Sequence, residues 1–339
     1  MRNECLIDWL RFSIPDTTEN HVASHILALG VSKFTQERKN SPYPTYHSKI
    51  TFANIEIHSS IHHNNILVNL PGQACRQYEE YMSAIDGWHW HEFIKIILQN
   101  NGTFTRIDLA LDIFDNTSPS VAKLQDYVKR GQLSTRSHTF KEINSGQILN
   151  GKLKGFTLYI GATPQMLRIY DKKQEQIANT GEVTHAKQWV RWELELTDKK
   201  AMEVAHLMTS ATPLNIIIKG ILAAHYSFKT QPKGKKDFHN KARWANMKWW
   251  NHFIENIPLM PLKVAKEKPT MKKTAKWLNH GVSKALAMQH QALIDAYGAE
   301  YANDYIKQLL ENGKSKFSEK DAYIIEQRVS ELTGSDTYE

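Results

Sequence analysis

The chain has 339 residues, 41% of them hydrophobic and 23% charged, so it is long enough for two domains with substantial cores. A net charge of +8 favours an acidic partner, nucleic acid before a membrane. Two cysteines, Cys5 and Cys75, exclude a disulfide framework and a CxxC zinc pair. The apolar run near the start contains an acid and an arginine, which excludes a secretory signal, and no run is long enough to span a bilayer. We therefore expect a cytoplasmic protein with no membrane partner.

Short alternating strands dominate the first part of the chain. Strand patterns occur at "CLIDWLRFSI" (5–14), "ANIEIHSS" (53–60) and "NNILVNLPG" (64–72), the last of which ends in a Pro-Gly turn. Apolar residues at helical spacing predict a helix in "HEFIKIILQNNG" (91–102), which a glycine terminates.

The next segments complete the predicted sheet. A strand in "FTRIDLALDIF" (104–114) precedes a helix in "SPSVAKLQDYVKRG" (118–131), and further strands follow at 156–161, 166–171 and 189–197. The connection "YIGATPQML" is short, which favours an antiparallel hairpin over a parallel crossover. The pattern predicts an α+β fold, with a largely antiparallel sheet and flanking helices.

Strand patterns disappear from about Ala201, and helical periodicity takes over. We therefore expect an α+β catalytic domain over residues 1–200 and a helical, basic DNA-binding region over residues 201–339.

Positive charge is concentrated in one block of that second region. Residues 229–276 contain thirteen lysines and arginines against three acids, a net +10, so the rest of the chain sums to −2. Lysines neutralise phosphates and aromatic rings stack on unpaired bases, although each tryptophan of the block taken singly is expected in the core. We expect DNA contacts from a set of basic residues: Lys172, Lys235, Lys236, Lys241, Arg243, Lys248, Lys272 and Lys273.

Three predicted strands carry charged residues on one face and apolar residues on the other, because alternate residues of a strand share a face. The charged positions are Arg106, Asp108 and Asp112 in the first strand, Arg168 and Tyr170 in the second, and Arg191, Glu193 and Glu195 in the third. A solvated antiparallel sheet can show the same alternation. Exposed strand faces, however, more often carry Thr, Lys and Ser, whereas this face carries Asp, Glu and Arg.

Clustered carboxylates repel one another, and a divalent cation offsets that repulsion. Oxygen ligands suit Mg²⁺ or Mn²⁺. A cation bound to a phosphodiester would stabilise the transition state for attack by a tyrosine, and Arg168, Lys172 and Lys173 would stabilise the phenolate as it forms. We expect Lys173 to lie over the phenol oxygen, one helical turn beyond it.

These segments resemble the replication initiation factor family, which includes rolling-circle initiators of small staphylococcal-type plasmids and of filamentous phages. The resemblance rests on "FTRIDLALDIFD" (104–115), "GFTLYIGATPQMLRIYDKKQEQ" (155–176) and "WVRWELEL" (189–196), in that order and spacing. "IDWLRFSI" (7–14) and "VNLPGQACR" (68–76) resemble the phage branch, with Ala74 where a glycine is more usual. Three motifs in register are more specific than any one of them alone.

The resemblance implies a role for each matching position. It makes Tyr170 the nicking nucleophile and Asp108, Glu193 and Glu195 metal ligands, in an enzyme that nicks one strand at an origin and primes from the 3′-OH. We expect Arg168, Arg191 and Lys173 to steady the phosphate, and Asp112 and Glu175 to act as secondary ligands or bases. The expected partners are origin DNA, both duplex and single-stranded, and a host helicase and polymerase, with a homodimer also possible.

Other chemistries remain open at this point. "HWH" (89–91) matches the metal motif of another nicking superfamily but opens a predicted helix, and His58, His62 and His63 have no partner at zinc spacing. A catalytically inactive DNA-binding regulator on the same scaffold is the main alternative. A tyrosine recombinase would need an all-helical catalytic domain, which the predicted strands oppose.

Overall fold

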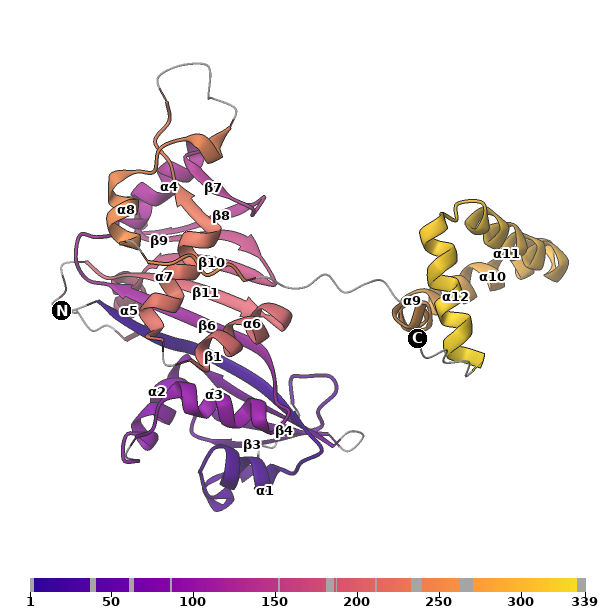
Figure 1. The fold of residues 1–339 in the computed structure, drawn as a ribbon, viewed down its shortest axis with the longest axis horizontal. Helices are drawn as coiled ribbons and strands as arrows, with labels where there is room; N and C mark the ends of the chain where they lie inside the picture. The colour runs from indigo at the N-terminus through magenta and orange to yellow at the C-terminus, as the bar shows by residue number, and fades with distance from the viewer. Residues whose placement is uncertain are drawn as a thin grey trace. The chain divides into compact units, whose positions relative to one another are not determined.

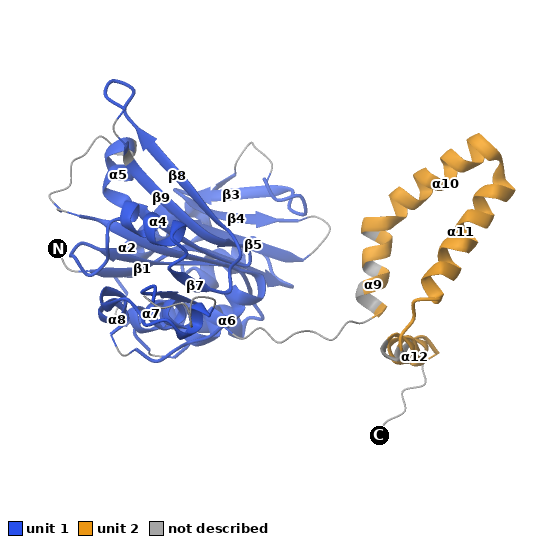
Figure 2. Cartoon of the chain, turned by 90° about the horizontal axis from the view of Figure 1, so that it is seen from above, with its two compact units in different colours: residues 1–264 blue, residues 265–339 orange. Residues whose placement is uncertain are grey.

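The structure is a computed structural model. It describes residues 3–36, 41–60, 64–85, 87–151, 153–180, 186, 188–210, 212–232, 240–255, 257–262 and 271–333. The chain forms two compact units, residues 1–264 and 265–339 (Figure 2), and each is described by itself. Residues 201–264 therefore belong with the sheet, whereas the sequence analysis set the boundary at residue 200. No described helix is both long and apolar enough to cross a membrane.

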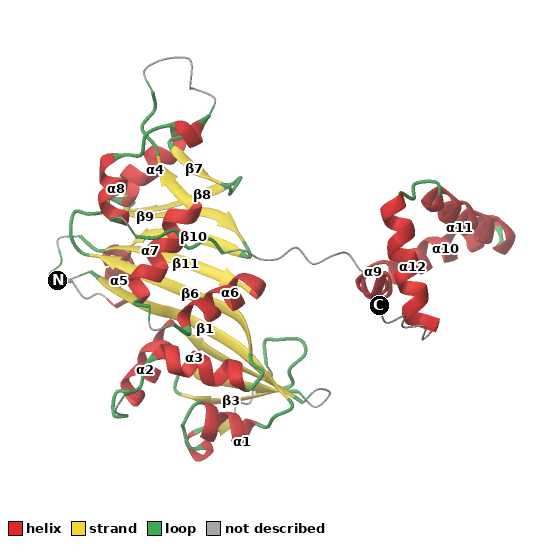
Figure 3. Ribbon diagram, in the orientation of Figure 1, coloured by secondary structure: helices red, strands yellow, loops and turns green. Residues whose placement is uncertain are grey.

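The first unit is built on one large sheet (Figures 1 and 3). Within the described residues it has ten strands in the order β2-β3-β4-β5-β1-β6-β11-β10-β9-β8, and every neighbouring pair is antiparallel. The strands are β1 (Glu4–Pro15), β2 (Thr35–Gln36), β3 (Ser48–Phe52), β4 (Ile55–Ser59), β5 (Asn65–Pro71), β6 (Thr103–Ile113), β8 (Phe140–Gly146), β9 (Leu153–Ala162), β10 (Gln165–Asp171) and β11 (Val190–Thr197). The α+β architecture and the antiparallel sheet predicted from the sequence are confirmed.

Helices of the first unit connect and cover the strands (Figure 3). They are α1 (Glu19–His21), α2 (Gly72–Met82), α3 (Trp90–Gln99), α4 (Val121–Lys129), α5 (Lys172–Thr180), α6 (Asp198–Met208), α7 (Leu214–His225) and α8 (Lys248–Ile254). Helix α3 ends where the sequence predicted. A side chain at Gly102 would place its Cβ 2.6 Å from the carbonyl oxygen of Ile97, so the residue must be glycine.

The core lies between one face of the sheet and the helices packed on it. Leu109, Trp192 and Leu194 are fully buried on that face, and α6 and α7 contact the strands that carry them. Alternation puts the residues between them on the opposite face, where the charged side chains gather. The apolar packing thereby fixes which side chains reach the candidate site.

Residues 226–262, expected to be helical, complete this core. A short strand, β12 (Tyr226–Phe228), pairs with β7 (Leu133–Thr135) in a second, two-stranded sheet. The rings of Trp250 and Phe253 in α8 pack at 6.1 and 4.9 Å from Trp192, and both side chains are buried. These aromatics belong to the core, as expected for single tryptophans of the basic block.

The second unit contains α9 (Met271–Trp277), α10 (Ser283–Tyr297), α11 (Ala299–Lys314) and α12 (Glu319–Thr333). Helices α10 and α11 pack on each other. Large apolar side chains of this unit, among them Trp277, Tyr297 and Leu310, are more than half exposed.

Candidate active site

Three adjacent strands bring the predicted residues together in two rows across the sheet. In the first row Tyr170 of β10 lies opposite Arg191 of β11, which lies opposite Asp112 of β6. In the second row Arg168 lies opposite Glu193. Glu195 and Asp108 form a third opposed pair further along β11 and β6. Residues from three separate sequence segments therefore share one surface.

The side chain of Tyr170 is only 5% exposed and points to this face. Its hydroxyl donates a hydrogen bond to Oε2 of Glu193, at 3.1 Å, and Arg168 pairs with the other oxygen of the same carboxylate. The Arg168 guanidinium carbon also lies 5.1 Å from the centre of the phenol ring. Burial, and then the charge of Glu193, raise the pKa of Tyr170 well above its ordinary value. The phenol is thus neutral, and its hydroxyl is hydrogen-bonded to the Glu193 carboxylate.

Arg191 joins three strands through two carboxylates. Its Nε and Nη2 donate to the two oxygens of Asp112, each at 2.7 Å, and its Nη1 donates to Asp8 at 2.9 Å. Asp8 comes from β1, two strands away from β11 in the sheet. It reaches this face because a register shift between Ile7 and Trp9 marks a β-bulge. Sequence reasoning missed Asp8, since strict alternation does not reveal a bulge.

The third pair is held by one arginine. Arg106 donates to both oxygens of Asp108, at 2.9 and 2.6 Å, and to Glu195 at 2.9 Å. Burial raises the pKa of Asp108 to about 7, against the opposing effect of Arg106. Burial likewise raises the pKa of Glu193. Burial therefore disfavours the charged form of both carboxyl groups.

Carboxylates and arginines alternate on this face. Five acids gather on it (Asp8, Asp108, Asp112, Glu193 and Glu195), and three arginines pair with them (Arg106, Arg168 and Arg191). Carboxylate oxygens are the donors that Mg²⁺ and Mn²⁺ prefer. Within the described residues no three acidic, His or Cys side chains already converge as a cation cage. The donor chemistry fits a divalent cation, while the arginines now engage the carboxylates.

The two lysines after Tyr170 have different positions from those expected. Lys173 donates to the carbonyl oxygen of Ala186 at 2.6 Å, away from the phenol oxygen. The amine of Lys172 lies 5.6 Å from the centre of the Tyr170 ring and pairs with Glu175. The expectation that Lys173 lies over the phenol oxygen is therefore wrong; the first turn of α5 places Lys172, not Lys173, beside the Tyr170 ring.

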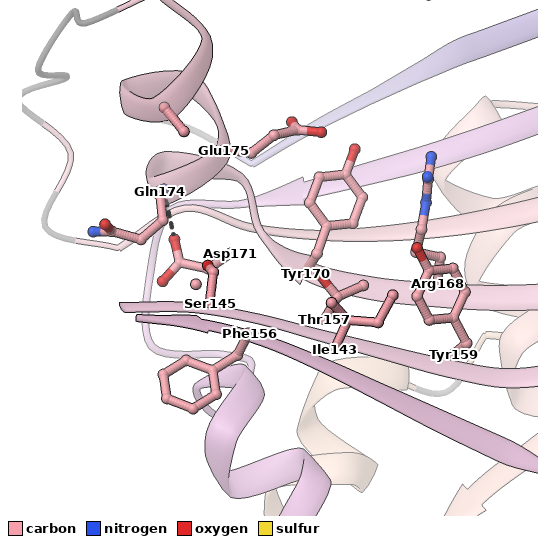
Figure 4. A pocket seen from close by; sticks show the side chains of 12 residues that line it. Ile143, Ser145, Phe156, Thr157, Tyr159, Arg168, Tyr170, Asp171, Gln174 and Glu175 are labelled. Carbon is pink, nitrogen blue, oxygen red and sulfur yellow. Dashed lines mark hydrogen bonds between the residues drawn. The ribbon is translucent and has the colours of Figure 1, made fainter. Parts of the chain in front are cut away.

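A cavity of about 230 Å³ opens beside Tyr170 (Figure 4). It lies between α5 and the face of β8 and β9, and Tyr170 is one of the residues that line it. Arg168 and Tyr159 border it as well. Tyr159 lies opposite Arg168 in the β9–β10 pair, so it belongs to the same face as the nucleophile candidate.

The predicted DNA-binding residues are only partly described. Lys241, Arg243 and Lys248 are exposed at or near the start of α8. Lys235 and Lys236 lie outside the described residues, as do the side chains of Lys272 and Lys273.

The histidine motifs lie away from Tyr170. Helix α3 begins at Trp90, so "HWH" opens a helix as predicted; the rings of His89 and His91 stack at 5.3 Å beside a separate cavity lined by α7. His58 is buried on β4 and pairs with Glu56. Three strands, β5, β1 and β6, separate β4 from β11 in the sheet. His62 and His63 lie outside the described residues.

Comparisons with known proteins agree with this architecture. A family model described as replication initiation factor matches residues 102–310, and a model of the rolling circle replication initiation protein N-terminal domain matches residues 4–96. A protein of Bacillus subtilis (strain 168), NicK, provisionally described as a DNA relaxase, is 24% identical over 292 residues, which cover 85% of this chain and 81% of that protein. The structure of a rolling circle replication initiator protein from Geobacillus stearothermophilus has the same fold, with a TM-score of 0.65 and 23% identity over 77% of this chain and 99% of that one.

Proposed function

Because this chain belongs to the replication initiation factor family, we propose that it starts rolling-circle replication by nicking and closing one strand of origin DNA through Tyr170. The observation that carries the proposal is the hydrogen bond from the Tyr170 hydroxyl to Glu193, within a surface that three strands supply. A buried phenol that donates to a carboxylate beside Arg168 and Lys172 is suited to attack on a phosphodiester and is poorly explained as core packing.

The proposed step conserves the energy of the broken bond. The phenol oxygen of Tyr170 bonds to phosphorus as the bond to the 3′ oxygen breaks, which leaves a 5′-phosphotyrosine and a free 3′-OH. Glu193 accepts the phenol proton through the existing hydrogen bond, and burial raises its pKa in the direction that makes it a better base. Reversal of the same step closes the strand.

The cationic groups stabilise the charge that develops. Arg168 and Lys172 lie close to the phenol ring, so each is placed to offset charge on the phosphate and on the phenolate. Arg191 is held by Asp112 and Asp8, and its role is to fix the position of β11 beside Tyr170. Lys173 would act only from a different rotamer.

Asp108 and Glu195 are the residues that would hold Mg²⁺ or Mn²⁺, with Oε1 of Glu193 as a further donor while Oε2 takes the phenol proton. When bound there, the cation would withdraw charge from the phosphodiester and help to stabilise the transition state. In this proposal Asp112 and Glu175 are secondary ligands or bases, and Arg191 and Lys172 respectively engage them.

The remaining parts of the proposal concern DNA and partners. Lys241, Arg243 and Lys248, with the lysines near them in sequence, would contact origin phosphates, which position the protein without reading sequence. The 3′-OH would prime a host polymerase while a host helicase unwinds the duplex, and a homodimer would match a symmetric origin.

The test is a covalent adduct. Wild-type protein is incubated with Mn²⁺ and with supercoiled or single-stranded DNA of its own replicon, and the products are separated on a denaturing gel. We expect nicked circles and protein linked to the 5′ end of the break. DNA binding without any adduct would favour the inactive regulator.

A further inference from the structure

The cavity beside Tyr170 lies over β8 and β9, on the other side of Tyr170 from Arg191. Ile143, Thr157 and Tyr170 are cross-strand neighbours in one row, so their side chains share a face and line one side of the cavity. Residues of α5 line the opposite side (Figure 4). Whatever enters this space lies directly against the phenol that attacks phosphorus in the proposed function.

The size of the cavity limits its occupant. At about 230 Å³ it is smaller than the range of about 300–1,000 Å³ for pockets that enclose drug-sized ligands. One planar ring system suits this volume better than several linked nucleotides do.

The floor of the cavity is apolar and accessible. Ile143 lies on the edge strand β8 with 45% of its surface exposed, next to Thr157. An apolar side chain in this place can cover one face of a base, and such a contact is sequence-tolerant because every base has a π-face.

Charged side chains surround the cavity unevenly. Arg168 and Lys172 lie over the Tyr170 ring, and Lys172 pairs with Glu175. A phosphate is attracted to these two cations. Asp171 lines the cavity at the start of α5, and its carboxylate oxygens favour a ligand with N–H donors there.

Resting on the proposed nicking function, we propose that this cavity holds one unpaired nucleobase next to the scissile phosphate and prefers a base with an exocyclic amino group over thymine. Ile143 and Thr157 contact the face of the base. Asp171 accepts from its amino group, as acidic side chains do from the amino group of cytosine.

Base preference is measured with a protein that leaves the DNA intact. Tyr170→Phe protein is titrated with short single strands of dA, dC or dT, and binding is followed by fluorescence anisotropy. We expect dA and dC to bind roughly tenfold more tightly than dT. Equal affinity for all three would overturn the proposal.

Three variants locate the effect. Asp171→Asn keeps an oxygen to accept from the backbone N–H of Gln174, at 3.1 Å, yet should bring the dA/dT ratio close to one. Ile143→Ala should weaken binding of all three strands severalfold, up to roughly tenfold, through lost apolar contact with the base. Ile148→Ala, fully exposed on the same hairpin and outside the cavity, should bind like the parent. A preference that survives Asp171→Asn, or unchanged binding by Ile143→Ala, contradicts the assignment.

A separate measurement distinguishes failure of this inference from failure of the proposed function. Protein with Tyr170 intact is tested for a covalent adduct with replicon DNA. An adduct without any base preference contradicts the base site alone. A base preference without an adduct contradicts the nicking proposal.

Discussion

At the scale of single residues, burial in the candidate site disfavours the charged forms of Tyr170, Asp108 and Glu193. Burial raises the pKa of Tyr170, Asp108 and Glu193 together, because all three lie in one poorly solvated patch. Such a patch gains most from an added cation, since each ionised group then acquires a partner. Binding of a cation should therefore favour the ionised forms of Asp108 and Glu193.

Asp108 gives this idea a measurable pH dependence. Its pKa is about 7 in the folded protein against 3.8 for the ordinary group, so its contribution to stability is complete below pH 4 and is lost as the pH rises through 7. Urea unfolding at pH 5 and pH 8 should show wild type losing on the order of 2 kcal/mol relative to Asp108→Asn. The pKa would be contradicted if wild type kept or gained stability relative to Asp108→Asn between pH 5 and pH 8.

A divalent cation should act in the opposite direction at the same residues. Because it binds carboxylates in their ionised form, Mn²⁺ should raise the unfolding temperature more at pH 8 than at pH 5. Asp108→Asn and Glu195→Gln should lose this shift, and Asp304→Asn, on the exposed face of α11, should keep it. If the shift is missing in wild type, or unaffected by these changes, the cation does not bind here.

At the scale of elements, the sheet is tied together across its site by Arg191. Its pair with Asp112 is buried, and removal of one partner of such a pair leaves an uncompensated charge. Arg191→Ala should therefore lower the free energy of unfolding by about 3–5 kcal/mol. Arg130→Ala, which breaks an exposed pair with Asp126, should cost about 0–1 kcal/mol in the same urea titration. Equal costs would show that Arg191 does not hold the strands.

Helix α8 provides a second contrast. Trp250 is 3% exposed and packs against Trp192, whereas Trp277 in α9 is 62% exposed. Trp250→Ala should cost about 3–5 kcal/mol of stability, and Trp277→Ala close to none. Thermal unfolding of the two variants checks this. If Trp250→Ala kept full stability but lost DNA affinity, Trp250 would contact DNA and would not be a core residue.

Strand alternation was enough to predict the central part of the site. It placed Asp108, Arg168 and Glu193 on one face, because the apolar residues between them leave a single way to bury each strand. It did not predict that their three strands are neighbours, which depends on pairing between distant segments. Nor did it reveal Asp8, which a bulge turns onto this face, or the exchange of Lys172 for Lys173, which depends on how α5 begins.

The compact unit that contains the sheet extends beyond residue 200 for a related reason. Helical periodicity in α6 and α7 looks the same whether a helix packs on a sheet or in a separate unit. The apolar faces of these helices complete the sheet's core, so the first unit extends to residue 264.

At the scale of the whole molecule, the two units differ in net charge. Residues 265–339 contain eleven lysines and arginines and eleven acids, so residues 1–264, with 32 and 24, carry the entire net charge of +8. A chain that ends after residue 264 should keep most of its DNA affinity, and the slope of log affinity against log salt should change by less than about one. A large fall in that slope would place the phosphate contacts in the second unit.

The identity of the attacking residue is the claim on which the rest depends. After nuclease digestion of the covalent adduct, peptide mass spectrometry should find a nucleotide attached through its 5′ phosphate to Tyr170, and Tyr170→Phe protein should yield no adduct. A nucleotide on any other residue, Tyr159 included, or an adduct that persists in Tyr170→Phe, would contradict the account.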